Sequence, residues 1–338
     1  MKTNITLNLN SHVLRSPIII GANDLVQNFD QYELIAQNTQ YLGAITTKSF
    51  TMNPRNGNLD PIVANYNNNV LVSSGIRNSG ANIMLDYISR YNLKYTNPII
   101  IPSIAIDPLT DESQQISELI DLANLTYQCG CKIIELNLSC PNLAQKVIIA
   151  NQPGKITTII QSIKDSFKQK GYTDYFLIAK IAGNDRSLIE TAKLAQLAYA
   201  DAITILPIIR SINFYTGLDR NSNNLGKPYL GNIDGTIYGD GLSGLTRYLT
   251  MELKKEITIP IIASGGCLGG INSTILQKTD ELIQTLLFSK ADAIAAVSPF
   301  YPFNVEKIKQ IDQIIQLFNQ YLIDNANILK PQLPRFYQ

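Results

Sequence analysis

A cysteine at the end of a strand is the first residue whose type and position could do chemistry. Residues 135–142 read ELNLSCPN, a strand pattern that runs directly into a Ser-Cys-Pro-Asn turn. Cys140 is thereby placed at the carboxyl end of that strand. A thiol with an ordinary pKa of about 8.5 can accept a carbon-bound proton when its surroundings favour the thiolate. A lone cysteine is also often a small buried apolar residue, so position alone leaves both interpretations open.

Two lysines also stand where strand patterns end, Lys48 after the run 43–48 and Lys180 within the run 176–181. Their ammonium groups could converge over the mouth of a barrel, where two cations would need an anionic partner. A lysine at a strand end can equally extend into solvent, so the role of both stays open at this point.

Glycine-rich turns offer candidate phosphate contacts. Gly265-Gly266 follow the seventh strand pattern, and barrels commonly bind phosphate with the loops after strands seven and eight. Residues 239–244 form a second glycine-rich turn that enters a helix, whose N-terminus favours anions. Glycine pairs are also common in ordinary turns.

The composition argues against several other functions. The single histidine, His12, is expected at the surface, which removes most imidazole chemistry. Four cysteines (Cys129, Cys131, Cys140 and Cys267) are too few for a disulfide framework and lack zinc-site spacing. A formal net charge of +1 gives no electrostatic reason to expect nucleic acid.

The N-terminus begins MKTNITLNLN, without a basic region followed by an apolar one. No stretch approaches the roughly 18 apolar residues that a membrane span needs. We therefore expect a soluble cytoplasmic protein. A chain of 338 residues, 45% of them hydrophobic, can bury a large core, as one barrel domain or two smaller domains.

The order of expected strands and helices favours the single barrel. Short β-branched runs alternate with helical patterns, as in βα units of a parallel sheet. Eight such runs predict a (β/α)8 TIM barrel of the α/β class, a single domain spanning residues 1–338. A preceding pair of strands, 5–8 and 13–15, predicts a hairpin that plugs one end. The runs are 17–21, 43–48, 99–105, 132–138, 176–181, 202–206, 260–264 and 292–297.

Two excursions, 49–97 and 207–241, are longer than ordinary loops and should lie at the C-terminal face, where barrel active sites are built. The second is rich in Asn and Gly and is either a mobile surface insertion or a lid. The expected helices are 111–127, 153–168, 186–199, 242–256, 273–288 and 305–323.

The segment ELNLSCPN resembles the active-site turn of the dihydroorotate dehydrogenases almost letter for letter. Further segments resemble the same family in the same order, so the resemblance covers nearly the whole chain. Cysteine in place of serine at position 140 is typical of the soluble, class 1 branch. The further segments are GAITTKSFTMNPRNGN (43–58), GIRNSG (75–80), PSIAI (102–106), LIAKIAG around Lys180, GLSG (241–244) and IIASGG (261–266).

The resemblance implies FMN-dependent oxidation of (S)-dihydroorotate to orotate in pyrimidine biosynthesis, with hydride passing to flavin N5 and the proton to Cys140. It implies that Lys48 contacts the substrate carboxylate and the flavin edge, that Lys180 lies beside flavin N1 and O2, and that Asn137 touches both ligands. It implies a homodimer and leaves the electron acceptor open; no metal site is expected. The other implied contacts are Asn78 and Asn142 for substrate, and Ala22, Ser49, Gly244, Gly265, Gly266 and Ser298 for the flavin.

The sequence departs from the family pattern where amides normally recognise the pyrimidine. Val72 and Pro207-Ile208 occupy two such places, leaving Asn137 and Asn142 unless Asn78 or Asn213 substitutes. Each polar ligand atom left unpaired would cost about 1–3 kcal/mol. Val297-Ser298-Pro299 also replaces the usual Gly-Thr of the phosphate loop. A flavin enzyme with another small substrate, or a non-catalytic barrel, therefore remains an alternative.

Overall fold

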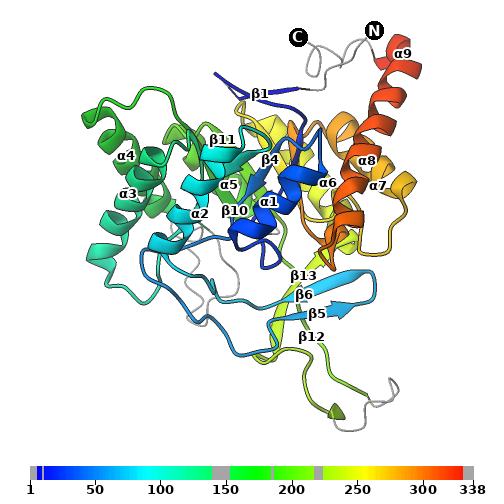
Figure 1. The fold of residues 1–338 in the computed structure, drawn as a ribbon, viewed down its shortest axis with the longest axis horizontal. Helices are drawn as coiled ribbons and strands as arrows, with labels where there is room; N and C mark the ends of the chain where they lie inside the picture. Colours follow the sequence, from blue (N-terminus) through cyan, green and yellow to red (C-terminus); the bar gives the residue numbers. More distant parts are fainter. Residues whose placement is uncertain (1–5, 10, 139–152, 184–185, 217–223, 330–338) are drawn as a thin grey trace.

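Parallel strands lie at the centre of the molecule, with helices on both sides of them (Figure 1). This computed structural model describes residues 6–9, 11–138, 153–183, 186–216 and 224–329. The sheet order is β7-β4-β3-β15-β14-β11-β10-β9-β8. Its two outer members, β7 (Ile99–Ile101) and β8 (Ser103–Ala105), are halves of one strand position interrupted at Pro102. The two edges therefore meet, and the predicted barrel is confirmed.

Every predicted barrel run contains an observed strand. The strands are apolar on both faces because one face lines the barrel and the other meets the helices. In β10 every residue is buried, including Lys180. The remaining barrel strands are β3 (Ile18–Ile20), β4 (Ala44–Thr46), β9 (Ile133–Asn137), β10 (Phe176–Ala182), β11 (Ala202–Leu206), β14 (Ile261–Ser264) and β15 (Ala293–Ala296).

The six predicted helices are confirmed as α3 to α8, and α1 and α2 were not predicted. A capping box formed by Asn28 and Gln31 begins α1 and was a missed signal. None of the helices that the structure describes is long and apolar enough to cross a membrane. The helices are α1 (Phe29–Asn38), α2 (Ala81–Lys94), α3 (Glu112–Gln128), α4 (Pro153–Gln169), α5 (Arg186–Leu197), α6 (Ser243–Glu256), α7 (Ile275–Ile283, with a π-helical turn Gln284–Phe288), α8 (Val305–Asp324) and α9 (Ala326–Leu329).

The predicted N-terminal hairpin closes one end of the barrel. It consists of β1 (Leu7–Leu9) and β2 (His12–Leu14), paired antiparallel. Leu9 and Leu14 are buried against barrel residues such as Ile133. This packing confirms the predicted plug.

The two long excursions meet in an antiparallel sheet at the other end of the barrel (Figure 1). The first excursion supplies β5 (Val63–Tyr66) and β6 (Asn69–Val72), joined by a tight turn with Asn67 at positive φ. The second supplies β12 (Arg210–Ile212) and β13 (Asp234–Gly239), and the order is β12-β13-β6-β5. This part of the second excursion is thus an ordered cover over the barrel.

Candidate active site

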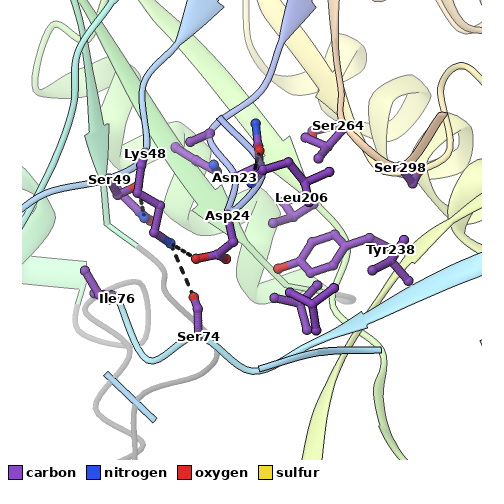
Figure 2. A pocket seen from close by; sticks show the side chains of 18 residues that line it. Asn23, Asp24, Lys48, Ser49, Ser74, Ile76, Leu206, Tyr238, Ser264 and Ser298 are labelled. Carbon is purple, nitrogen blue, oxygen red and sulfur yellow. Dashed lines mark hydrogen bonds and ion pairs between the residues drawn. The ribbon is translucent and has the colours of Figure 1, made fainter. Parts of the chain in front are cut away.

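The main pocket lies between the carboxyl ends of the barrel strands and the antiparallel sheet (Figure 2). It holds about 950 Å³ of space, including solvent at its mouth. This is the face where barrels carry their active sites. Six of the predicted site residues line it together: Ala22, Lys48, Ser49, Asn137, Lys180 and Ser298.

Lys48 is held in the pocket by a carboxylate and a hydroxyl (Figure 2). Its Nζ lies 2.9 Å from Asp24 Oδ1 and donates a hydrogen bond of 3.3 Å to Ser74 Oγ. Both side chains of the ion pair are only 8% exposed. Asp24 comes from the turn after β3 and Ser74 follows β6, so Lys48 joins the barrel rim to the excursion.

Lys180 is paired below the pocket with Glu135, whose Oε1 lies 3.5 Å from Lys180 Nζ. Glu135 points into the barrel and is 3% exposed. It also accepts hydrogen bonds from Ser103 Oγ (2.9 Å) and Thr204 Oγ1 (3.2 Å). Several donors therefore stabilise this buried carboxylate, which offsets its loss of hydration.

A chain of hydrogen bonds connects the pocket to this carboxylate. Asn137 Nδ2 donates to Ser49 Oγ over 2.9 Å, and Ser49 Oγ lies 2.8 Å from Ser103 Oγ. Ser103 donates to Glu135, so Ser49 must be the donor in the Ser49–Ser103 bond. The amide of Asn137 is thus oriented by the barrel interior.

A smaller cavity adjoins the main pocket between β14 and β15. Its lining includes Gly265 and Gly266, and it shares Tyr238, Ser264 and Ser298 with the main pocket. Both glycines have positive φ, and neither of their N–H groups donates a hydrogen bond to a residue that the structure describes. Such N–H groups can receive an anion.

Three of the remaining residues considered from the sequence lie away from the pocket lining. Asn78 uses its amide within the first excursion, where it bonds to Thr51, Ile76 and Gly80. Gly244 lies in the first turn of α6, and Asn213 bonds to Ser211. Their ligand contacts stay predictions. Cys140 and Asn142 lie outside the described residues.

Two other cysteines have environments that disfavour a thiolate. Burial raises the pKa of Cys131 to about 12 and that of Cys267 to about 12. Neither thiol lies in the main pocket lining. These two residues are structural, small apolar side chains.

The structure also adds pocket residues that the sequence did not single out. Asp24 and Ser74 contact Lys48, and their only sequence signal is that each follows a strand. Val72, which was expected to replace an amide, does line the pocket. It belongs to a largely apolar wall together with Leu25, Val63, Val70, Ile76, Leu206 and Val297.

Comparison with known proteins agrees with this geometry. The family model described as dihydroorotate dehydrogenase matches residues 5–274. A relative from Endomicrobium trichonymphae, named dihydroorotate dehydrogenase B (NAD(+)), catalytic subunit, is 26% identical over 95% of this chain and 99% of its own length. A relative of the same name from Carboxydothermus hydrogenoformans is 29% identical over 67% of each chain. The chain belongs to the dihydroorotate dehydrogenase family.

Proposed function

We propose that this protein oxidises (S)-dihydroorotate to orotate in pyrimidine biosynthesis, with FMN as its flavin. The observation that carries the proposal is the meeting of Lys48, Asn137 and Lys180 in one pocket, in a chain of this family. Two lysines, each paired with a carboxylate, and an oriented amide suit a polar ring.

The described residues offer donor chemistry that fits FMN. The main pocket adjoins the smaller cavity, which suits a flat ring joined to a phosphate tail. Gly265, Gly266 and Ser298 would hold the phosphate, and Lys180 and Ser49 would contact the ring. When bound, FMN would accept a hydride from the substrate.

The protein's own groups would handle the proton and the charges. Dihydroorotate loses one hydrogen with its electron pair and one proton from the neighbouring carbon, and a carbon–carbon double bond forms. The Cys140 thiolate would take the proton and become a thiol. Asn137 would orient the ring, and Lys180 would stabilise negative charge that develops on the flavin side.

The apolar wall favours a second candidate function. Val63, Val70, Val72 and Leu206 offer no hydrogen bonds from their side chains to a pyrimidine edge. The same flavin and proton chemistry could therefore act on a different small cyclic or unsaturated substrate. This second candidate function keeps every other feature of the site. It ranks second because the matching family model is that of dihydroorotate dehydrogenase.

Electrons must leave the reduced flavin for an acceptor. The relatives are named as catalytic subunits of an NAD(+) enzyme, which supports a partner subunit that transfers electrons to NAD(+). A homodimer and a cytoplasmic location stay predictions.

Changing Cys140 to Ala tests the proton step. We expect flavin reduction by dihydroorotate to slow by about 100-fold or more, the usual contribution of a general base, with FMN content unchanged. Stopped-flow absorbance of the flavin measures the rate under anaerobic conditions. Cys129→Ala is the control and should reduce at the wild-type rate; an unchanged rate in Cys140→Ala would contradict the assignment.

A further inference from the structure

The charged groups around the pocket balance one another. Lys48 and Lys180 line it, and each pairs with a carboxylate of the same chain: Asp24 at 2.9 Å and Glu135 at 3.5 Å. Two positive and two negative groups give these four residues a net charge of zero. An anionic ligand therefore does not enter a site with two uncompensated cations.

The two carboxylates differ in position. Glu135 lies beneath the pocket, where Ser103 and Thr204 donate to it, and it is not part of the pocket lining. Asp24 does line the pocket. A negative group that approaches Lys48 must therefore meet the charge of Asp24, whereas the charge of Glu135 is held inside the barrel.

The turn that carries Asp24 is fixed by its neighbour. Asn23 donates from Nδ2 to the carbonyl of Gly21 (2.6 Å), and its Oδ1 accepts from the N–H groups of Leu25 (2.6 Å) and Val26 (2.9 Å). Asn23 itself is 8% exposed. These bonds on both sides of Asp24 hold its backbone in place.

The surroundings of the ion pair strengthen its effect. Leu25, Val70, Val72 and Ile76 contribute to the lining of the same pocket, and Figure 2 shows Asp24 and Lys48 facing each other there. Charges interact more strongly in apolar, poorly hydrated surroundings than in water. Asp24 is therefore an effective competitor for the ammonium group of Lys48.

We propose that Asp24 determines the charge preference of this pocket. It holds Lys48 in an internal ion pair, so the pocket accepts an uncharged group beside Lys48 and a substrate carboxylate must displace Asp24. The proposal rests on the proposed function for the identity of the pocket. It predicts that wild-type affinity for a carboxylate ligand is limited by Asp24.

Orotate and uracil provide a matched pair of probes, because they differ only by the carboxylate. Each is titrated into the FMN-loaded full chain and followed by the flavin absorbance. In Asp24→Asn, we expect orotate to bind about tenfold more tightly than in wild type, a gain of about 1.4 kcal/mol. Uracil affinity should change by less than about twofold, since no charge is involved.

Asp107→Asn is the control, because it also removes one carboxylate from a largely buried ion pair. Asp107 pairs with Arg55, and neither residue lines the pocket. Asp107→Asn should leave the ratio of orotate to uracil affinity unchanged. Asp24→Ser is the second variant, for use if Asp24→Asn loses FMN or does not fold. An unchanged ratio in the Asp24 variants, or no measurable orotate binding by them, would overturn the proposal.

Reduction of the wild-type flavin by dihydroorotate is measured separately. If wild type is not reduced while Asp24→Asn gains orotate affinity, the proposed substrate is wrong and the role of Asp24 stands. If dihydroorotate reduces the wild-type flavin and the Asp24 variants do not change the ratio of orotate to uracil affinity, the proposed substrate stands and the role of Asp24 is wrong.

Discussion

Asn137 donates to Ser49, whose hydroxyl meets that of Ser103, and Ser103 donates to Glu135. Each member of this chain is oriented by the next, and the last is held by the barrel interior. Side chains oriented in this way do not have to be ordered when a ligand binds. At the scale of single residues, contacts within the protein therefore orient the amide of Asn137.

The glycine after Gly265 illustrates how closely the cavity wall is packed. Gly266 has φ +75°, and an added Cβ would lie 2.6 Å from both the carbonyl oxygen of Gly239 and the N of Ser243. Backbone atoms cannot yield as a flexible side chain can. Gly226 has nearly the same φ, +76°, but open space around it. Comparing alanine substitutions at the two glycines therefore distinguishes the cost of backbone strain from the cost of steric crowding.

We predict that Gly266→Ala lowers the free energy of unfolding by about 3 kcal/mol, the sum of backbone strain and overpacking, and weakens FMN binding. Gly226→Ala should cost only about 1–2 kcal/mol, the strain of a left-handed residue, and leave FMN binding intact. Urea unfolding and FMN titration measure both effects. Equal costs in the two variants would show that the crowding at Gly266 has no consequence.

At the scale of elements, several barrel strands bring polar side chains to the same end of the molecule. The β-branched runs were sufficient to predict all eight strands, because burial on both faces demands uninterrupted apolar residues. Helix α2 was missed because it lies inside the first excursion, which was expected to be a long loop, although its buried residues Ala81, Met84, Ile88 and Tyr91 keep helical spacing. The antiparallel sheet could not be predicted, since Val72 pairs with Thr236 far away in the sequence.

The packing of α7 on α8 contains a buried lysine that is unrelated to the active site. Lys278 is 1% exposed, and its Nζ donates to Gln310 Oε1 over 2.6 Å. Burial is the main cause that lowers the pKa of Lys278 to about 8, with a smaller contribution from Lys307. The charged lysine therefore destabilises the folded protein at neutral pH.

We predict that Lys278→Met raises the free energy of unfolding by about 2 kcal/mol at pH 7. Between pH 8 and the ordinary lysine pKa of 10.5, Lys278 binds more protons in the unfolded chain than in the folded one. The contribution of Lys278 to the free energy of unfolding of wild type therefore increases as the pH rises through this range. The advantage of the variant should shrink across that range. Urea unfolding at several pH values measures the difference in free energy of unfolding between Lys278→Met and wild type. Lys309→Met, at an exposed position of α8, is the control. A difference for Lys278→Met that does not shrink with rising pH would contradict this explanation.

At the scale of the whole molecule, the pocket is assembled from segments that only the closed barrel brings together. Asp24, Ser74, Asn137 and Lys180 lie on four different parts of the chain and line one cavity. The strand-end positions of Lys48, Asn137 and Lys180 were predictable from the sequence. The ion pair of Asp24 with Lys48 was not, because it depends on the distance between two neighbouring strand ends.

The same assembly explains why the two halves of the site differ in character. The barrel strand ends supply most of the polar groups, and the antiparallel sheet supplies the apolar side chains of Val63, Val70 and Val72. The barrel strands and the excursions therefore both contribute to the ligand-facing surface.

Anaerobic mixing of the FMN-loaded protein with dihydroorotate tests the central claim most directly. The flavin absorbance near 450 nm should be lost in a single turnover at a rate that rises with substrate concentration and then saturates, and orotate should appear in equal amount. A flavin that stays oxidised at high dihydroorotate concentration, in a protein that still reduces with dithionite, would contradict it.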